Sequence, residues 1–176
     1  SVVRYAHRWA FGRNPRYYNF DELGGDCTNF ASQCLYAGSG IMNYTPDFGW
    51  YYIGPNNKAP AWTGVPYFYN FLTRKEENRG PVGVRASLEE LLPGDFVQLR
   101  FDSELFGHTP VVVEVGDPPR LDNILVAAHS VDAELGLYLL NHKRERLSLM
   151  EKEFHIRLDI RIEGISSAPA APAQQQ

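Results

Sequence analysis

The order of two residue patterns along this sequence does most to limit its fold. Apolar residues at spacings of three and four, typical of one helix face, occur within 1–12 and 27–37, and a short helix is expected at 65–72. Short β-rich runs bounded by turn residues follow at 96–101, 109–115, 124–128, 138–140 and 153–163. Helices first and strands second predict an α+β fold, with N-terminal helices packed on one face of an antiparallel β-sheet.

The length of 176 residues fits one domain with a single core, which we assign to residues 1–164. Residues 165–176 are rich in Pro, Ala and Gln, a composition typical of a tail or linker. The net charge of -4, from 17 Lys and Arg against 21 Asp and Glu, comes without a basic stripe and argues against a nucleic-acid partner. No apolar run approaches the roughly 20 residues of a membrane span, so none is expected. The oligomeric state is left open.

Cys27 is the candidate nucleophile. It follows Gly24, Gly25 and Asp26, which let the chain turn sharply into the helix predicted from residue 27. The unpaired N–H groups and the positive dipole end of a first helical turn stabilise a thiolate, so we expect a lowered pKa for Cys27. The alternative is a packed, inert thiol, as expected for Cys34 on the apolar face of the same helix. A separation of seven residues gives roughly 10 Å of helical rise, beyond the reach of a disulfide, so both thiols are expected to be free.

A cysteine that attacks a carbonyl needs a proton donor for the leaving amine, and histidine supplies protons near neutral pH. His108 stands at the entrance of the apolar run 109–115, and His129 closes the next apolar run. We interpret His108 as general acid and base to Cys27, and His129 as the residue that holds the other imidazole nitrogen of His108. Asp132 is the reserve for this orienting role. The alternatives are a solvated loop position for His108 and a simple backbone hydrogen bond for His129.

An oxyanion hole is expected from the backbone N–H of Cys27 together with a donor from the segment that precedes it. Tyr18 ranks first among the candidates for this second donor. Asp26 is assigned a supporting role because of its place directly before the nucleophile.

The segment 41–71 is dense in aromatic residues among Pro, Gly and Asn. Trp50 and Trp62 could line a substrate cleft, stacking on sugar faces or flanking a peptide. The favoured alternative is a satellite core under a long loop. A metal centre is not expected, because the sequence lacks a His-Glu-x-x-His motif and paired cysteines.

The stretch 24–34, Gly-Gly-Asp-Cys-Thr-Asn-Phe-Ala-Ser-Gln-Cys, resembles the signature of the bacterial putative amidase domain family. That family belongs to the papain-like superfamily, alongside the cysteine, histidine-dependent amidohydrolases/peptidases of the bacterial cell wall. His108 is similar to the superfamily's strand-entry histidine, and His129 to its third polar position. Further pieces that look like the family in the same order are 62–63, 67–72 and 92–95.

The resemblance covers roughly residues 1–160 and implies a papain-like fold. It implies a cysteine amidase or peptidase that works through a Cys thioester, without metal or organic cofactor. It also implies a peptidoglycan or related peptide substrate and favours a secreted or cell-envelope location. Two alternatives stay open: an acyl transferase using the same triad, and a non-catalytic cell-envelope binding module on this scaffold. One departure is Pro110, which cannot donate to a ladder and predicts an irregular strand start after His108.

Overall fold

The computed structural model of the chain describes residues 1–76, 78–101, 106–120, 123–129, 145–146 and 156–163. The predicted strand 138–140, the reserve residue Asp132 and the tail 165–176 lie outside this described part, and the domain boundary at 164 stays a prediction. None of the helices in the described ranges is both long enough and apolar enough to cross a membrane.

The described residues form four α-helices: α1 (Val2–Trp9), α2 (Cys27–Ser39), α3 (Pro60–Thr63) and α4 (Val65–Leu72). α2 is buried along almost its whole length and ends at Gly40, which adopts the left-handed conformation at φ 68°. α1 lies close against α2 because Gly38 has no side chain: a Cβ there would come within 2.5 Å of Val2 Cγ2. The helix predicted at 65–72 is confirmed with the same bounds, and α3 was not predicted.

The strands confirm the α+β prediction. The main sheet is antiparallel, and its central strand is β4, whose side chains at Phe96, Val97 and Leu99 are buried. The strand predicted at 96–101 is confirmed, because β4 has the same bounds. The sheet runs in the order β3 (Val84–Arg85), β9 (Ile156–Glu163), β4 (Phe96–Phe101), β6 (Val111–Val115), β7 (Ile124–Ala127) and β8 (Glu145–Arg146), with β5 (Phe106–His108) also paired to β4.

β5 and β6 lie one after the other along the same edge of β4. Leu99 pairs with His108 in β5, and Phe96 pairs with Val111 in β6. The interruption falls at Pro110, which has no N–H and only accepts, from the N–H of Val97 at 3.0 Å. The predicted irregularity is confirmed, and its consequence is that His108 ends a short strand of its own instead of opening the strand that follows.

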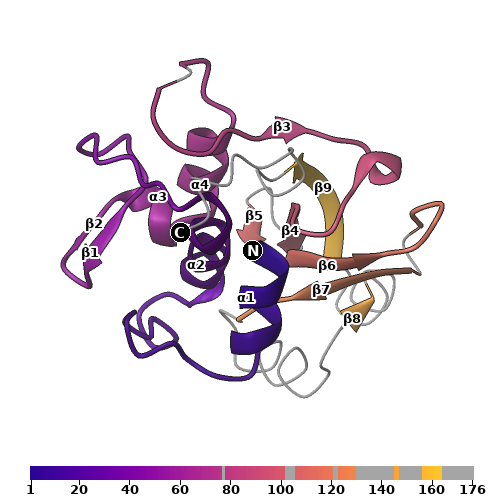
Figure 1. Cartoon of the computed structure of the whole chain (residues 1–176), viewed down its shortest axis with the longest axis horizontal. Coiled ribbons are helices and arrows are strands. Elements are labelled where there is room, and N and C mark those ends of the chain that lie inside the picture. Colours follow the sequence, from indigo (N-terminus) through magenta and orange to yellow (C-terminus); the bar gives the residue numbers. More distant parts are fainter. Residues whose placement is uncertain (77, 102–105, 121–122, 130–144, 147–155, 164–176) are drawn as a thin grey trace.

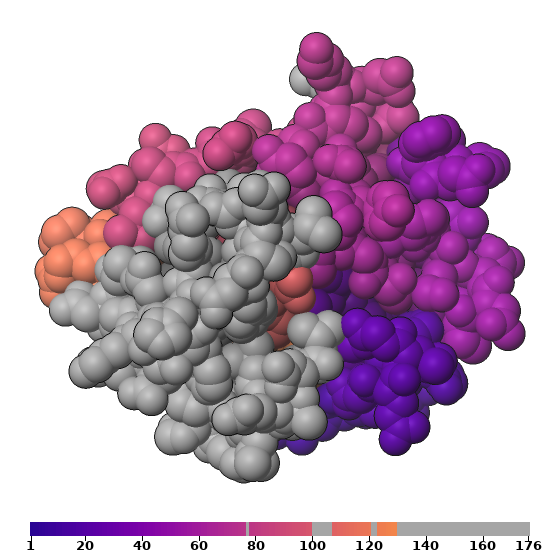
Figure 2. Space-filling view, turned by 180° about the vertical axis from the view of Figure 1, so that it is seen from behind, coloured from indigo at the N-terminus to yellow at the C-terminus, as the bar shows by residue number. Residues whose placement is uncertain are grey.

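The helical half of the chain covers one side of this sheet (Figure 1). α1 contacts both α2 and β6, while α4 contacts β5. The small hairpin of β1 (Tyr52–Gly54) and β2 (Asn57–Lys58) extends away from the sheet beside α3. Seen from behind, the indigo to magenta residues gather on one side of the molecule, which agrees with this two-part arrangement (Figure 2).

Trp50 and Trp62 are core residues. Both side chains are fully buried, with ring centroids 4.9 Å apart. Their indole N–H groups donate within the core, Trp50 to Ser32 Oγ and Trp62 to Asn29 Oδ1, each at 2.9 Å. The substrate contact predicted for these two tryptophans is therefore wrong, because a ring without exposed surface cannot stack on a ligand. The aromatic segment instead packs on α2.

Candidate active site

The start of α2 places Cys27. The chain reaches it through Gly24 and Gly25 at φ +93° and +104°, a region of backbone space that favours glycine. Asp26 stands at the N-cap, and its carbonyl accepts the first helical hydrogen bond, from the N–H of Phe30 at 2.9 Å. The glycine-bent helix start is thus present. The Cys27 side chain is 2 % exposed, and both cysteines are free thiols.

The sulfur of Cys27 lies beside the segment that carries His108. Sγ is 4.0 Å from the carbonyl oxygen of Gly107 and 3.7 Å from Thr28 Oγ1. The Thr28 hydroxyl is hydrogen-bonded to the hydroxyl of Thr109 at 3.2 Å. Contacts on both sides of His108 in the chain therefore join the end of β5 to the first turn of α2. His108 itself is fully buried.

Burial sets the protonation states of Cys27 and His108. It raises the pKa of the Cys27 thiol, although hydrogen bonds from Thr28 and the Thr109 N–H oppose the shift. It lowers the pKa of His108 to about 4. At neutral pH Cys27 is therefore a thiol and His108 a neutral imidazole. The lowered pKa predicted for Cys27 is wrong, because desolvation outweighs the favourable end of the helix. The pKa of Cys34, buried among apolar side chains, is raised further.

His129 has partners other than the predicted one. Its Nδ1 is 2.7 Å from Asp26 Oδ2, and its Nε2 is 2.8 Å from the carbonyl oxygen of Trp9. The ring stacks on Phe30 with centroids 3.9 Å apart. The predicted role of holding His108 is therefore not supported, because both ring nitrogens are engaged elsewhere. One nitrogen faces a carboxylate oxygen and the other faces a main-chain carbonyl oxygen.

Asp26 is the centre of the network that His129 joins. Its fully buried carboxylate accepts at Oδ1 from the Phe20 N–H (2.9 Å) and from Asn29 Nδ2 (2.8 Å). At Oδ2 it lies 3.2 Å from Arg13 Nε, besides the contact with His129. Burial alone would raise the pKa of Asp26, but the hydrogen bonds from His129, Phe20 and Asn29 outweigh it and lower the pKa below its ordinary value.

The Asp26 network fixes the residue before the candidate nucleophile to three other parts of the fold: the end of α1, the loop at Phe20 and the end of β7. We had assigned Asp26 only a supporting role. Its link to His129 spans 103 positions in the chain. The one sequence signal for it was an Asp between a glycine pair and a cysteine.

Tyr18 does not offer its backbone N–H to an oxyanion. This group donates to the hydroxyl of Tyr52 at 2.9 Å, and the carbonyl of Tyr18 accepts from Asn29 at 3.0 Å. The side chain is 45 % exposed and stands against the edge of Phe20. Tyr18 therefore belongs to the wall of a neighbouring pocket. The backbone N–H of Cys27 keeps the predicted donor role as a proposal.

Comparison with known proteins gives the chain a family. The family model described as a putative amidase domain matches residues 1–156. The "Uncharacterized protein YhbB" of Bacillus subtilis (strain 168) is 34% identical over 140 residues, which are 77% of this chain and 42% of that protein. The chain thus spans less than half the length of this relative. No solved structure matches it. On the match over residues 1–156, the chain belongs to the putative amidase domain family, whose description suggests amide hydrolysis.

Proposed function

We propose that this chain is a cysteine-dependent amidohydrolase or peptidase, with Cys27 as nucleophile and His108 as general acid and base. One observation carries the proposal: the Cys27 sulfur, at the start of a helix, lies 4.0 Å from the carbonyl of the residue before His108. Support also comes from the Thr28–Thr109 hydroxyl pair, which holds the two segments in register. The family description agrees with the cleavage of an amide bond.

The reaction begins from the neutral pair. As Sγ attacks the substrate carbonyl carbon, the thiol proton passes to His108, and the carbonyl electron pair moves to oxygen, near the Cys27 N–H. Collapse of this intermediate breaks the C–N bond, and His108 returns the proton to the departing amine. Water then gives a proton to His108 as its oxygen attacks the thioester carbon. The C–S bond breaks, the acid is released, and His108 passes that proton to Sγ, which restores the thiol and the neutral imidazole. Proton transfer accompanies the attack, because burial disfavours a standing thiolate.

We further propose that the scaffold is papain-like and that the substrate is a peptide of peptidoglycan or one related to it. Support for the scaffold comes from the arrangement of a cysteine at a helix start against a histidine presented by an antiparallel sheet. Support for the substrate comes from the resemblance of residues 24–34 to the amidase signature. A secreted or cell-envelope location follows from such a substrate.

The direct test is incubation with purified peptidoglycan and with its soluble fragments, followed by mass spectrometry of the new termini. We expect Cys27→Ala to lower the rate by at least about a thousandfold, as removal of a nucleophile does. Cys34→Ala is the matched control on the same helix and should keep activity. Release of the same termini by Cys27→Ala would sink the nucleophile assignment.

A second candidate function is favoured by the burial of the site. A Cys27 that is only 2 % exposed and a buried, neutral His108 would also suit a non-catalytic binding module that retains the scaffold. Labelling with iodoacetamide near neutral pH separates the two candidates. The enzyme should label Cys27 much faster than Cys34, because His108 is its proposed base and its thiol pKa is raised less. Equal and slow labelling of both thiols would instead support the binding module.

A further inference from the structure

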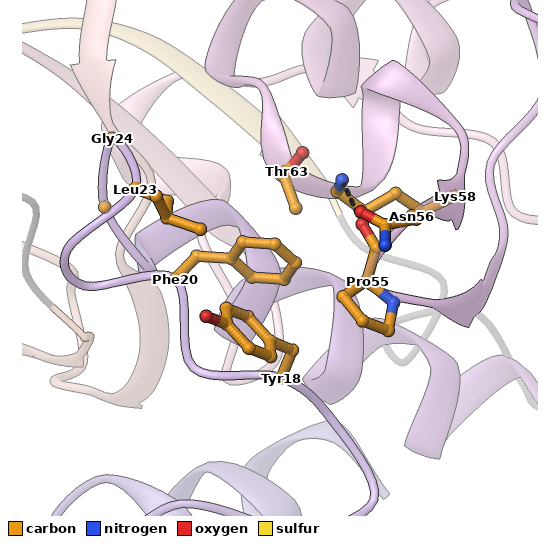
Figure 3. A pocket seen from close by; sticks show the side chains of 9 residues that line it. Tyr18, Phe20, Leu23, Gly24, Pro55, Asn56, Lys58 and Thr63 are labelled. Atoms are coloured by element: carbon orange, nitrogen blue, oxygen red, sulfur yellow. Dashed lines mark hydrogen bonds between the residues drawn. The ribbon is translucent and has the colours of Figure 1, made fainter.

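A polar pocket of about 410 Å³ opens beside the start of α2. Figure 3 shows Tyr18, Phe20 and Leu23 on one side of it, facing Pro55, Asn56 and Lys58 on the other. The first three belong to the loop that leads to Gly24 and Gly25, and the second three to the β1–β2 hairpin. Thr63, at the end of α3, also lines the space.

The loop wall of this pocket and α3 are both fixed to the first turn of α2, the helix that Cys27 begins. Asn29, two residues after Cys27, donates from Nδ2 to the carbonyl of Tyr18 at 3.0 Å. With Oδ1 it accepts from the indole of Trp62, the neighbour of Thr63, at 2.9 Å. One buried side chain thus sets the spacing between the loop wall and α3. The pocket is thereby tied to the helical turn that Cys27 begins.

The hairpin wall is tied to the loop wall as well. The hydroxyl of Tyr52, in β1, accepts from the N–H of Tyr18 at 2.9 Å. Lys58, in β2, places its ammonium 4.9 Å from the ring centroid of Phe20. The hairpin is therefore joined directly to the loop by these two contacts.

The lining of the pocket carries positive charge only. Among the described residues that line it, Lys58 is the one with a charged side chain, and no Asp or Glu is present. The Lys58 ammonium donates to the carbonyl of Pro55 at 2.8 Å, which uses one of its three donors. The amide of Asn56 lines the same wall, and Phe20 and Leu23 offer apolar surface opposite. Such a lining suits a group with an apolar stem and an anionic end.

We propose that this pocket is the substrate subsite that binds a peptide residue with a side-chain or terminal carboxylate, with Lys58 as the partner of that carboxylate. Its reading as a substrate subsite rests on the proposed amidase function. An acidic residue of the peptide then lies against the Gly24–Gly25 turn, close to the bond presented to Cys27. Lys58 sets specificity and takes no part in the chemical steps.

The test uses the full chain carrying Cys27→Ala, so that binding is measured without turnover. The probes are N-acetyl-alanyl-glutamic acid amide and N-acetyl-alanyl-glutamine amide, which differ only in the carboxylate, each with an L or a D second residue. Each is titrated into ¹⁵N-labelled protein, and the backbone amides are followed by NMR. We expect the glutamate probe of one configuration to shift the amides of Gly24, Gly25 and Asn56 saturably. Its glutamine counterpart should bind about fivefold more weakly.

Substitutions of Lys58 identify the partner of the carboxylate. Lys58→Gln should abolish the fivefold preference, whereas Lys58→Arg keeps the charge and should retain it. Lys75→Gln, at an exposed lysine outside this pocket, is the matched control and should leave the preference intact. The proposal is overturned by the absence of saturable shifts at these amides, by equal binding of both probes, or by a preference that survives Lys58→Gln. Since every protein here lacks the thiol, this outcome is separate from the amidase test, which scores new termini.

Discussion

At the scale of single residues, Asp26 and Cys27 are neighbours in the chain with opposite electrostatic settings. Asp26 is buried but receives hydrogen bonds on both oxygens, so its carboxylate remains charged. Cys27 is also buried and hydrogen-bonded, but burial outweighs the hydrogen bonds from Thr28 and Thr109 and raises its pKa, so its thiol remains protonated. Burial alone therefore does not decide the charge of a group. The balance between burial and the hydrogen bonds to each group decides it, and in this site the negative charge stays on the residue before the candidate nucleophile.

The first prediction concerns Asp26→Asn. This change leaves His129 and Arg13 near a buried site without their carboxylate, and loss of one partner of a buried pair generally costs about 3 kcal/mol or more. We expect the free energy of unfolding, measured by urea denaturation, to fall by about that amount. Asp21→Asn is the matched control, because Asp21 pairs with the same arginine at 2.6 Å but is exposed. It should change the free energy by less than about 1 kcal/mol.

A double-mutant cycle extends the Asp26 experiment. Asp26→Asn and His129→Gln should couple by more than about 1 kcal/mol, because the two side chains lie in contact at 2.7 Å. Additive effects would show that the 2.7 Å contact contributes nothing to stability. The same two variants report on Cys27: each should change the rate of Cys27 alkylation while leaving that of Cys34 unaltered.

At the scale of elements, the sequence predicted those parts of the fold that local patterns determine. The helix at 65–72 and the strand at 96–101 were predicted with their observed bounds, because each has its own apolar pattern and its own flanking turn. The β1–β2 hairpin and α3 were missed, since strands of two or three residues and a four-residue helix carry no measurable period. The partner of His129 was predicted wrongly because periodicity says which face is buried and not which distant residue lies there.

The sequence likewise predicted those features of the candidate site that depend on neighbouring residues, and not those that depend on distant ones. Cys27 at the helix start could be predicted, because the Gly24–Gly25 turn and the apolar helix are adjacent in the chain. The change in its pKa could not, because desolvation depends on β5 and the residues around it, more than 75 positions further along. The pocket beside Lys58 likewise joins a loop and a hairpin that no local pattern connects.

Gly38→Ala tests how α1 is held to α2. The added Cβ would come within 2.5 Å of Val2 Cγ2, so α1 must move outward or the valine must change rotamer. We expect a loss of about 1–3 kcal/mol in the free energy of unfolding, as for overpacked cores, measured by urea denaturation. Gly54→Ala is the control, because a Cβ there has nothing within 4 Å, and its effect should stay below about 0.5 kcal/mol. Equal effects of the two substitutions would contradict the close packing of these helices.

At the scale of the whole molecule, two buried residues of the candidate site make the stability of the fold depend on pH. The buried His108 is the general base of the proposed reaction, and the buried Asp26 holds the helix start. Both groups resist protonation in the folded chain more than in the unfolded one, since their folded pKa values are lowered. The unfolded chain therefore binds more protons as the pH falls, and both groups make the fold less stable in acid.

The pH dependence of unfolding tests this directly. In the unfolded chain His108 takes up a proton near pH 6.5, but in the folded chain its pKa is about 4. The contribution of His108 to the free energy of unfolding is therefore complete above pH 6.5 and is lost as the pH falls toward 4. This difference corresponds to a loss of about 3 kcal/mol in the free energy of unfolding, measured by urea denaturation at each pH. The loss connected with Asp26 begins below its ordinary pKa of 3.8 and follows at lower pH. His108→Gln should flatten the curve between pH 4 and 6.5 and leave the fall below pH 4 in place. Two outcomes would place His108 in a solvated position: a native curve that is already flat over that interval, or a curve that His108→Gln does not alter. A solvated His108 could not remain neutral at acid pH.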